Sequence, residues 1–156
     1  MRLKNKLAAA QFPLEATMFQ GISEDPDGSF WLLTGSLDAP LCHLTDGAVK
    51  CFGKADGIPI SRIDTLLADG RGGFWLGGQT ALVHWHGGVS ETYRISGAKP
   101  TGIGIQALAR GPDGSLWVGI LAEGPGLGLT RFQDGALKTE GRFSFMLFRR
   151  NGTLKL

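Results

Sequence analysis

The chain has 156 residues, of which 42% are hydrophobic and 19% charged, and its formal net charge is +2. This length is enough for one domain with a hydrophobic core. The basic residues are scattered, and no apolar run approaches the ~18 residues of a membrane span, so we expect neither a nucleic-acid partner nor membrane insertion by this segment.

The N-terminal segment 1–18 comes before any repeated pattern. Its first six residues include Arg2, Lys4 and Lys6, a basic stretch like the n-region of a signal peptide. The apolar run Leu7–Ala10 that follows is shorter than the ~7–15 residues of an h-region. We therefore expect no complete signal peptide in this sequence.

Short predicted strands follow in three units of four, separated by turns. Asp25-Pro26-Asp27-Gly28 has turn chemistry, because Pro presets φ and Gly accepts a positive φ. Asp46-Gly47 is typical of a two-residue hairpin loop. The predicted strands are Phe19–Glu24, Ser29–Thr34, Leu41–Leu44 and Ala48–Phe52, then Ile63–Ala68, Gly73–Gly77, Ala81–Trp85 and Val89–Tyr93, then Ile105–Arg110, Ser115–Ile120, Gly128–Phe132 and Ala136–Glu140.

A tryptophan stands on the second strand of each unit, three positions after a turn glycine. The three tryptophans are separated by 44 and 42 positions. Four strands per ~40–45 residues is the signature of a propeller blade. We predict an all-β fold, a partial β-propeller of three four-stranded antiparallel blades, with one Trp per blade filling the layer between blades. The repeated residues are Trp31, Trp75, Trp117, Gly28, Gly72 and Gly114.

Three blades are too few to close a propeller, which typically has ~4–8. The chain is therefore a piece of a longer propeller, one partner in a ring of two copies, or an open fan. The predicted divisions are residues 1–18 as an N-terminal segment or the last strand of a preceding blade, three blades at 19–62, 63–104 and 105–141 (together 19–141), and 142–156 as a C-terminal apolar strand or frayed tail.

The units resemble the two-component regulator propeller repeat, whose pattern is D-x-x-G-x-[LF]-W-[IVL]-G-T. Trp75-Leu76-Gly77-Gly78 and Trp117-Val118-Gly119-Ile120 match its core, and Asp56-Gly57-Ile58-Pro59 resembles its D-G-L-P linker. The resemblance spans about residues 18–141, although unit one has Leu33-Thr34 for Gly-Thr and unit three has no Asp at position 111. It implies an extracytoplasmic, periplasmic sensor domain of a hybrid histidine kinase, which binds a glycan or another small ligand in signal transduction.

Two other functions remain open. Gly111-Pro112-Asp113-Gly114-Ser115-Leu116-Trp117 resembles the units of streptogramin lyase propellers, but the F-T-E that usually follows Trp there is missing. This weaker resemblance implies an enzyme, whereas a protein-interaction scaffold is the third reading. Since no nucleophile elbow, phosphate loop or telling metal spacing is visible, we expect a non-enzymatic module with no catalytic residues, no metal and no cofactor.

The strand order predicts where a ligand would bind. Antiparallel strands place the first and third turns of every blade on one face, and the second loops and inter-blade linkers on the other. We name these the turn face and the linker face. The linker-face loops are the longer and more irregular ones, and binding groups concentrate on such loops. Their polar candidates are Asp38, Lys54, Arg62, Gln79, Lys99 and Glu123.

The turn aspartates and the histidines could suggest a metal site or a catalytic site, but each also has a simpler structural explanation. The repeated aspartates stand in turns beside Gly, where turn geometry alone favours Asp. His84 and His86 are two positions apart and share a strand face, but no third ligand stands at a telling spacing.

The two cysteines are predicted to face each other. If Asp46-Gly47 is a two-residue loop, Cys42 pairs with Cys51 across the hairpin in a non-hydrogen-bonded pair, with Cα atoms ~4.5 Å apart. This spacing permits a disulfide. We expect it to form in an oxidising compartment and the pair to remain as thiols in cytosol.

Overall fold

The computed structural model describes residues 19–60, 62–97, 103–121 and 127–139. These residues form three four-stranded antiparallel sheets, so the predicted all-β partial propeller is confirmed. The predicted segments 1–18 and 142–156 lie outside the described residues. The one helical element of the described chain is a single 3-10 turn, η1 (Lys54–Asp56).

Each predicted strand end falls within one residue of the observed end. The first sheet has β1 (Phe19–Glu24), β2 (Phe30–Thr34), β3 (Leu41–Leu44) and β4 (Val49–Phe52). The second has β5 (Ile63–Ala68), β6 (Phe74–Gly78), β7 (Ala81–His86) and β8 (Val89–Arg94). The third has β9 (Gly104–Arg110), β10 (Leu116–Leu121), β11 (Gly128–Gln133) and β12 (Ala136–Thr139).

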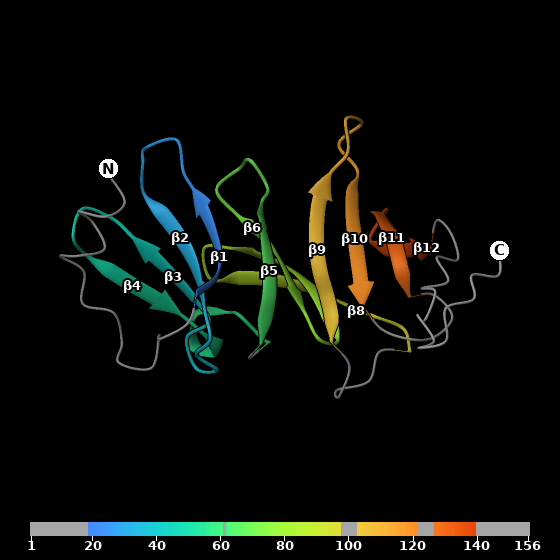
Figure 1. Ribbon diagram of the computed structural model, residues 1–156, viewed down its shortest axis with the longest axis horizontal. Helices are drawn as coiled ribbons and strands as arrows, with labels where there is room; N and C mark the ends of the chain where they lie inside the picture. Colours follow the sequence, from blue (N-terminus) through green and yellow to red (C-terminus); the bar gives the residue numbers. More distant parts are fainter. Residues whose placement is uncertain (1–18, 61, 98–102, 122–126, 140–156) are drawn as a thin grey trace, which may run out of the picture.

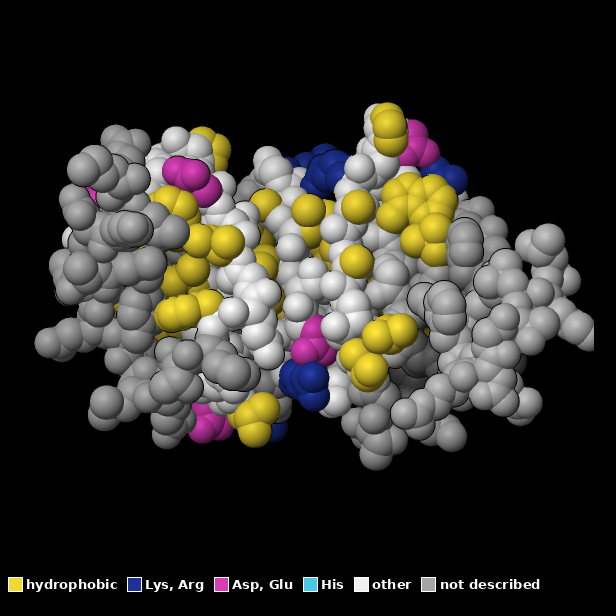
Figure 2. Space-filling model, viewed as in Figure 1, with side chains coloured by type: hydrophobic (Ala, Val, Ile, Leu, Met, Phe, Trp, Pro, Cys, Tyr) yellow, Lys and Arg dark blue, Asp and Glu magenta, His cyan; other side chains and the backbone are white. Residues whose placement is uncertain are grey.

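The three sheets stand side by side like the blades of a fan (Figure 1). In each sheet the strands pair in chain order, and the first strands β1, β5 and β9 lie next to one another. These first strands are therefore the inner edge of the fan, and β4, β8 and β12 are its outer edge. Hydrophobic side chains are visible on the face seen in Figure 2, and Phe19 and Ile22 of β1 are about half exposed.

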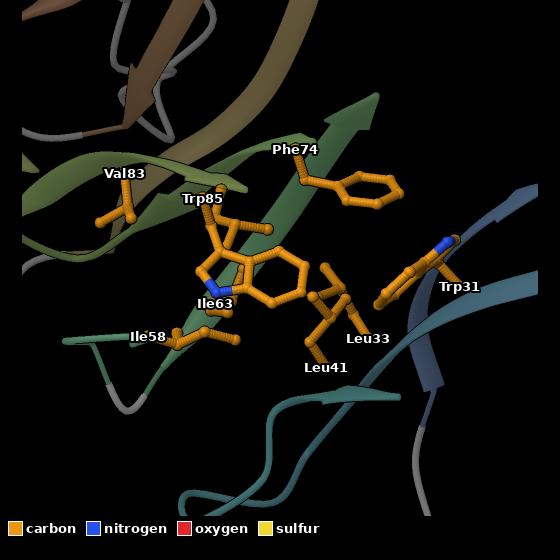
Figure 3. Packing of buried hydrophobic residues seen from close by; sticks show 9 residues of the cluster. Trp31, Leu33, Leu41, Ile58, Ile63, Phe74, Val83 and Trp85 are labelled. Carbon is orange, nitrogen blue, oxygen red and sulfur yellow. The ribbon is translucent and has the colours of Figure 1, made fainter. Parts of the chain in front are cut away.

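The core lies between blades, as the repeated tryptophan predicts. Trp31 of β2 is buried, with its ring 4.9 Å from Phe74 and 5.8 Å from Trp85 in the second blade. Figure 3 shows it turned toward these two rings, beside Leu33 and Leu41. One blade supplies the indole, and the next blade supplies the aromatic rings that pack against it. An isolated four-stranded blade would therefore leave this apolar face exposed to solvent.

The second tryptophan repeats this contact less completely, and the third has a different environment. Trp75 is half-buried, with its ring 5.0 Å from Phe132 in the third blade. Trp117 lies on the side of β10 opposite to Val118, which packs toward the second blade. It is half-buried, and its ring faces the guanidinium of Arg131 at 5.7 Å. No further blade follows it within the described residues.

The hairpin of β3 and β4 has the predicted register. Cys42 is paired directly with Cys51, their Cα atoms are 4.0 Å apart, and their sulfur atoms are bonded. Gly47 takes the positive φ, +81°, that the tight loop needs. The disulfide therefore joins the two outer strands of the first blade.

Candidate ligand-binding faces

The linker face carries a hollow of about 300 Å³ between the first two blades. The loop after β2 forms one wall and the start of β5 the other. Three hydrogen bonds made by side chains of the described residues hold that loop: from Thr34 Oγ1 to the Ala39 carbonyl, from the Ser36 amide to Thr34 Oγ1, and from the Ala39 amide to Ser36 Oγ. The wall is therefore organised by its own side chains. The lining residues are Gln20, Thr34, Gly35, Ser36, Leu37, Arg62 and Ile63.

Arg62 is the charged group of this hollow. Its Nε donates to Asp64 Oδ1 at 3.0 Å, and its side chain is 51% exposed while that of Asp64 is 8% exposed. Asp64 Oδ2 is buried and has no hydrogen-bond partner within the described residues. The aspartate thus orients an arginine whose remaining N–H groups are available to a ligand.

The other linker-face candidates in the described residues, Asp38, Lys54 and Gln79, do not line the hollow. The carbonyl oxygen of Asp38 lies where a Cβ on Gly53 would stand, so the loops carrying Asp38 and Lys54 touch. Gln79 follows Gly78, which packs on the carbonyl oxygen of Arg62. Of the four candidates in the described part of the chain, only Arg62 lines the hollow. Lys99 and Glu123 lie outside the described residues.

The turn face carries a repeated contact that the sequence did not reveal. In each blade the second-strand tryptophan stands directly across from a third-strand His or Arg. His43 stacks on Trp31 with ring centroids 4.2 Å apart, and His84 stacks on Trp75 at 4.1 Å. In the third blade, Arg131 stands across from Trp117 at the position that histidine occupies in the other two blades. Each of these cationic or titratable groups reaches back to a first-turn side chain.

The first-turn partner differs from blade to blade. His43 Nε2 lies 2.9 Å from Ser29 Oγ, whereas His84 Nε2 lies 2.9 Å from Asp69 Oδ2. Arg131 forms an ion pair with Asp113. Position 111, which corresponds to Asp69, is glycine in the third blade. The arginine therefore reaches a carboxylate two residues further along the turn.

The turn aspartates have the structural role expected from their turn chemistry. Asp69 Oδ1 accepts the amides of Arg71 and Gly73 at 2.6 and 2.9 Å. Burial alone would raise the pKa of Asp69, but its hydrogen bonds from His84 and from the two backbone amides outweigh burial and lower it. Hydrogen bonds from Ser115, and the charge of Arg131, lower the pKa of Asp113. Both carboxylates are thus held in the ionised form.

A cleft of about 440 Å³ opens on the turn face between the second and third blades. Sequence reasoning assigned binding to the linker face and missed this cleft. One available signal was Arg71, which stands four residues before Trp75 where the other two units have aspartate. The cleft is lined by Asp69, Arg71, Trp75, His84, Arg110, Asp113, Gly114, Ser115, Leu116, Arg131, Phe132, Gln133 and Asp134.

Two other structural findings bear on the site. Across the described ranges, no group of three or more His, Cys, Asp or Glu side chains is arranged to hold a metal ion. The same ranges contain no helix long and apolar enough to cross a membrane.

No protein-family model matches the chain, and no curated protein matches it in sequence. Solved structures do match in three dimensions. The extracellular domain of BT3049, assigned to a hybrid two component system of B. thetaiotaomicron, is 13% identical with a TM-score of 0.59 over 77% of this chain and 16% of its own. That of BT4673 from the same organism, assigned to a one component system, is 20% identical with a TM-score of 0.52 over 75% of this chain and 15% of its own.

A structure of streptogramin B lyase is similar to the same degree. It is 16% identical with a TM-score of 0.59, over 80% of this chain and 40% of its own. The chain spans about one sixth of the length of the extracellular domains and less than half of the lyase. At these identities the matches establish the propeller fold, and both of the resemblances seen in the sequence lead to proteins with this fold.

Proposed function

We propose that this chain is a ligand-binding, sensor-type propeller module without enzymatic activity, belonging to an extracytoplasmic signal-transduction protein. The likeness to the extracellular domains of two signalling systems, over about three quarters of this chain, carries the proposal. The repeat pattern supports it independently, because it resembles the two-component regulator propeller. The proposed ligand is a small molecule or a glycan fragment.

The proposed binding region is the linker face, at the hollow around Arg62. Its loop wall is held by internal hydrogen bonds, and its arginine is oriented by a buried aspartate. Binding to a preformed wall costs less conformational entropy than ordering a loose loop. The outlying candidates Asp38, Lys54 and Gln79 are proposed to contact larger ligands that extend from this hollow.

A binding screen tests this region. The chain would be titrated with a panel of neutral di- and trisaccharides, and binding would be followed by calorimetry. We expect Arg62→Ala to weaken binding of any hit by about tenfold, since hydrogen bonds from charged donors contribute ~1.5–3 kcal/mol. Lys50→Ala, at an exposed position of the outer strand β4, serves as the matched control. An equal loss in both variants would contradict the linker-face assignment.

The extracytoplasmic location is supported by the Cys42–Cys51 disulfide, since such bonds persist mainly in oxidising compartments. The test is thiol labelling of protein recovered from its native compartment without reductant. Blocked thiols are expected. Two free thiols in freshly isolated protein would argue against an oxidising location.

Further blades are the proposed partners of this chain, supplied by a longer polypeptide or by a second copy. Trp117 supports this, because it occupies the position that packs against the next blade in the other two units. Light scattering of the purified chain distinguishes the two sources. A dimer would favour a second copy as the source of the missing blades. A monomer whose free energy of unfolding rises when the polypeptide is lengthened would favour further blades in the same chain.

A streptogramin-lyase-like enzyme is the second candidate. It is favoured by a TM-score of 0.59, equal to the best of the sensor-domain matches described above. Incubating the chain with a type B streptogramin and a divalent cation tests it directly. Conversion of the streptogramin to a product with a different chromatographic retention would replace the non-enzymatic proposal.

A further inference from the structure

The turn-face cleft is lined by three aspartates and three arginines, and the aspartates have partners that leave two of the arginines without a carboxylate. Asp113 pairs with Arg131, and Asp134 lies 3.6 Å from Lys138. Asp69 is engaged by His84 and by two backbone amides. All three carboxylates that line the cleft are therefore occupied by partners within the chain.

Two arginines of the cleft have no such carboxylate. Arg71 projects from the first turn of the second blade and is exposed, and none of the ion pairs among the described residues includes it. Arg110 extends from β9 of the third blade, and its Nη2 donates to the Ala68 carbonyl of the second blade at 3.2 Å. The two guanidinium groups thus come from opposite walls, one of them anchored across the gap.

The remaining wall of the cleft is partly aromatic. Trp75 and Phe132 both line it, with ring centroids 5.0 Å apart and planes inclined at 58°. Leu116 lines it as well, and Ser115 and Gln133 supply polar groups. At about 440 Å³ the cleft lies within the usual range of small-ligand sites, ~300–1,000 Å³.

We propose that this cleft is a second binding site, specific for a carboxylate carried on a six-membered ring. The carboxylate lies between Arg71 and Arg110, which can each present a planar fork of N–H donors to it. The ring lies along the Trp75 and Phe132 wall. An acidic sugar and an aromatic acid share this chemistry. Because the cleft is separate from the linker-face hollow, a test of this proposal does not depend on whether the proposed function is correct.

The test is a calorimetric or NMR titration of the complete chain at low ionic strength with four probes. Glucuronate and benzoate carry the carboxylate on a ring, whereas glucose and benzyl alcohol are their neutral counterparts. We expect saturable binding of at least one acid, and at least tenfold weaker binding of its neutral counterpart. The acid that binds more tightly identifies the sugar or the aromatic source. Because two fixed charges attract the ligand, its affinity should also fall as salt is added.

Variants place the binding in the cleft. Arg71→Gln and Arg110→Gln are each expected to lower the binding affinity for the acid by about tenfold. Arg94→Gln, an exposed arginine of β8 that does not line the cleft, is the matched control and should bind normally. Amide spectra of each variant show whether it remains folded.

Four results would overturn the proposal. The first is that neither acid binds. The second is that each acid and its neutral counterpart bind equally. The third is that folded Arg71→Gln and Arg110→Gln proteins retain full affinity. The fourth is that acetate, titrated in addition to the four probes, binds as tightly as either ring acid, because the aromatic wall would then contribute nothing.

Discussion

Reducing the Cys42–Cys51 disulfide should lower the stability of the chain by a predictable amount. The bridge joins residues separated by 9 positions. Treating its effect as lost chain entropy in the unfolded state gives about 2.5–3 kcal/mol for a loop of this size. With a urea m-value of ~2–3 kcal/mol per molar, the unfolding midpoint should fall by about 1 M.

The assay compares urea unfolding, followed by tryptophan fluorescence, with and without dithiothreitol. Reduction leaves the buried Cys42 side chain in place, so the difference is not confused with a packing cavity. The chain has no other cysteine, so Cys42→Ala/Cys51→Ala is a control that should not respond to dithiothreitol. An unchanged midpoint, in protein whose thiols are shown to be reduced, would refute the entropic reasoning.

Three further predictions follow from individual contacts. Gly73→Ala should cost about 1–3 kcal/mol in urea unfolding, because its Cβ would lie 2.8 Å from the Trp85 carbonyl oxygen, whereas Gly119→Ala, whose nearest neighbour is at 3.3 Å, should cost less. The lowered pKa of Asp69 stabilises the fold above ~pH 4 and ceases to do so as pH falls through the folded-state pKa, so Asp69→Asn should flatten the loss of stability between neutral and acidic pH. A hydrogen bond to Glu91, together with burial, raises the pKa of Tyr93 to about 12. Since Tyr93 is the only tyrosine, tyrosinate absorbance should titrate near that value, and at a lower pH in Glu91→Gln, closer to the unperturbed ~10; a wild-type titration near ~10 would contradict the contact.

The fold was predictable because its signals are local and repeated. Alternating apolar residues and Asp-Gly turns define each strand to within one residue. The Trp spacing counts the blades, and the two-residue loop at Asp46-Gly47 sets the register that brings Cys42 opposite Cys51. The Trp spacing compares repeated units, whereas the strand and register inferences depend on residues fewer than ten positions apart, where backbone geometry leaves few alternatives.

The sites were predictable only in part. The division into a turn face and a linker face follows from antiparallel order, and Arg62 lines a hollow on the linker face. That Asp38, Lys54 and Gln79 do not line this hollow depends on which backbone each loop packs against, Gly53 for Asp38 and Gly104 of the next blade for Gln79. The His–Asp pair of the second blade and the Arg–Asp pair of the third were also hidden, because their partners are 15 and 18 positions apart and on different strands.

By itself, the sequence determined that this chain forms three four-stranded blades, with a tryptophan between successive blades and a cysteine pair on one hairpin. The tertiary structure alone decided which side chains of different blades meet. Arg110 reaches the Ala68 carbonyl 42 residues away, between the same two blades that Trp75 and Phe132 join by ring packing. The physical reason is that periodicity specifies the face on which a side chain emerges, whereas the contacts across a cleft depend on the distance and angle between packed sheets.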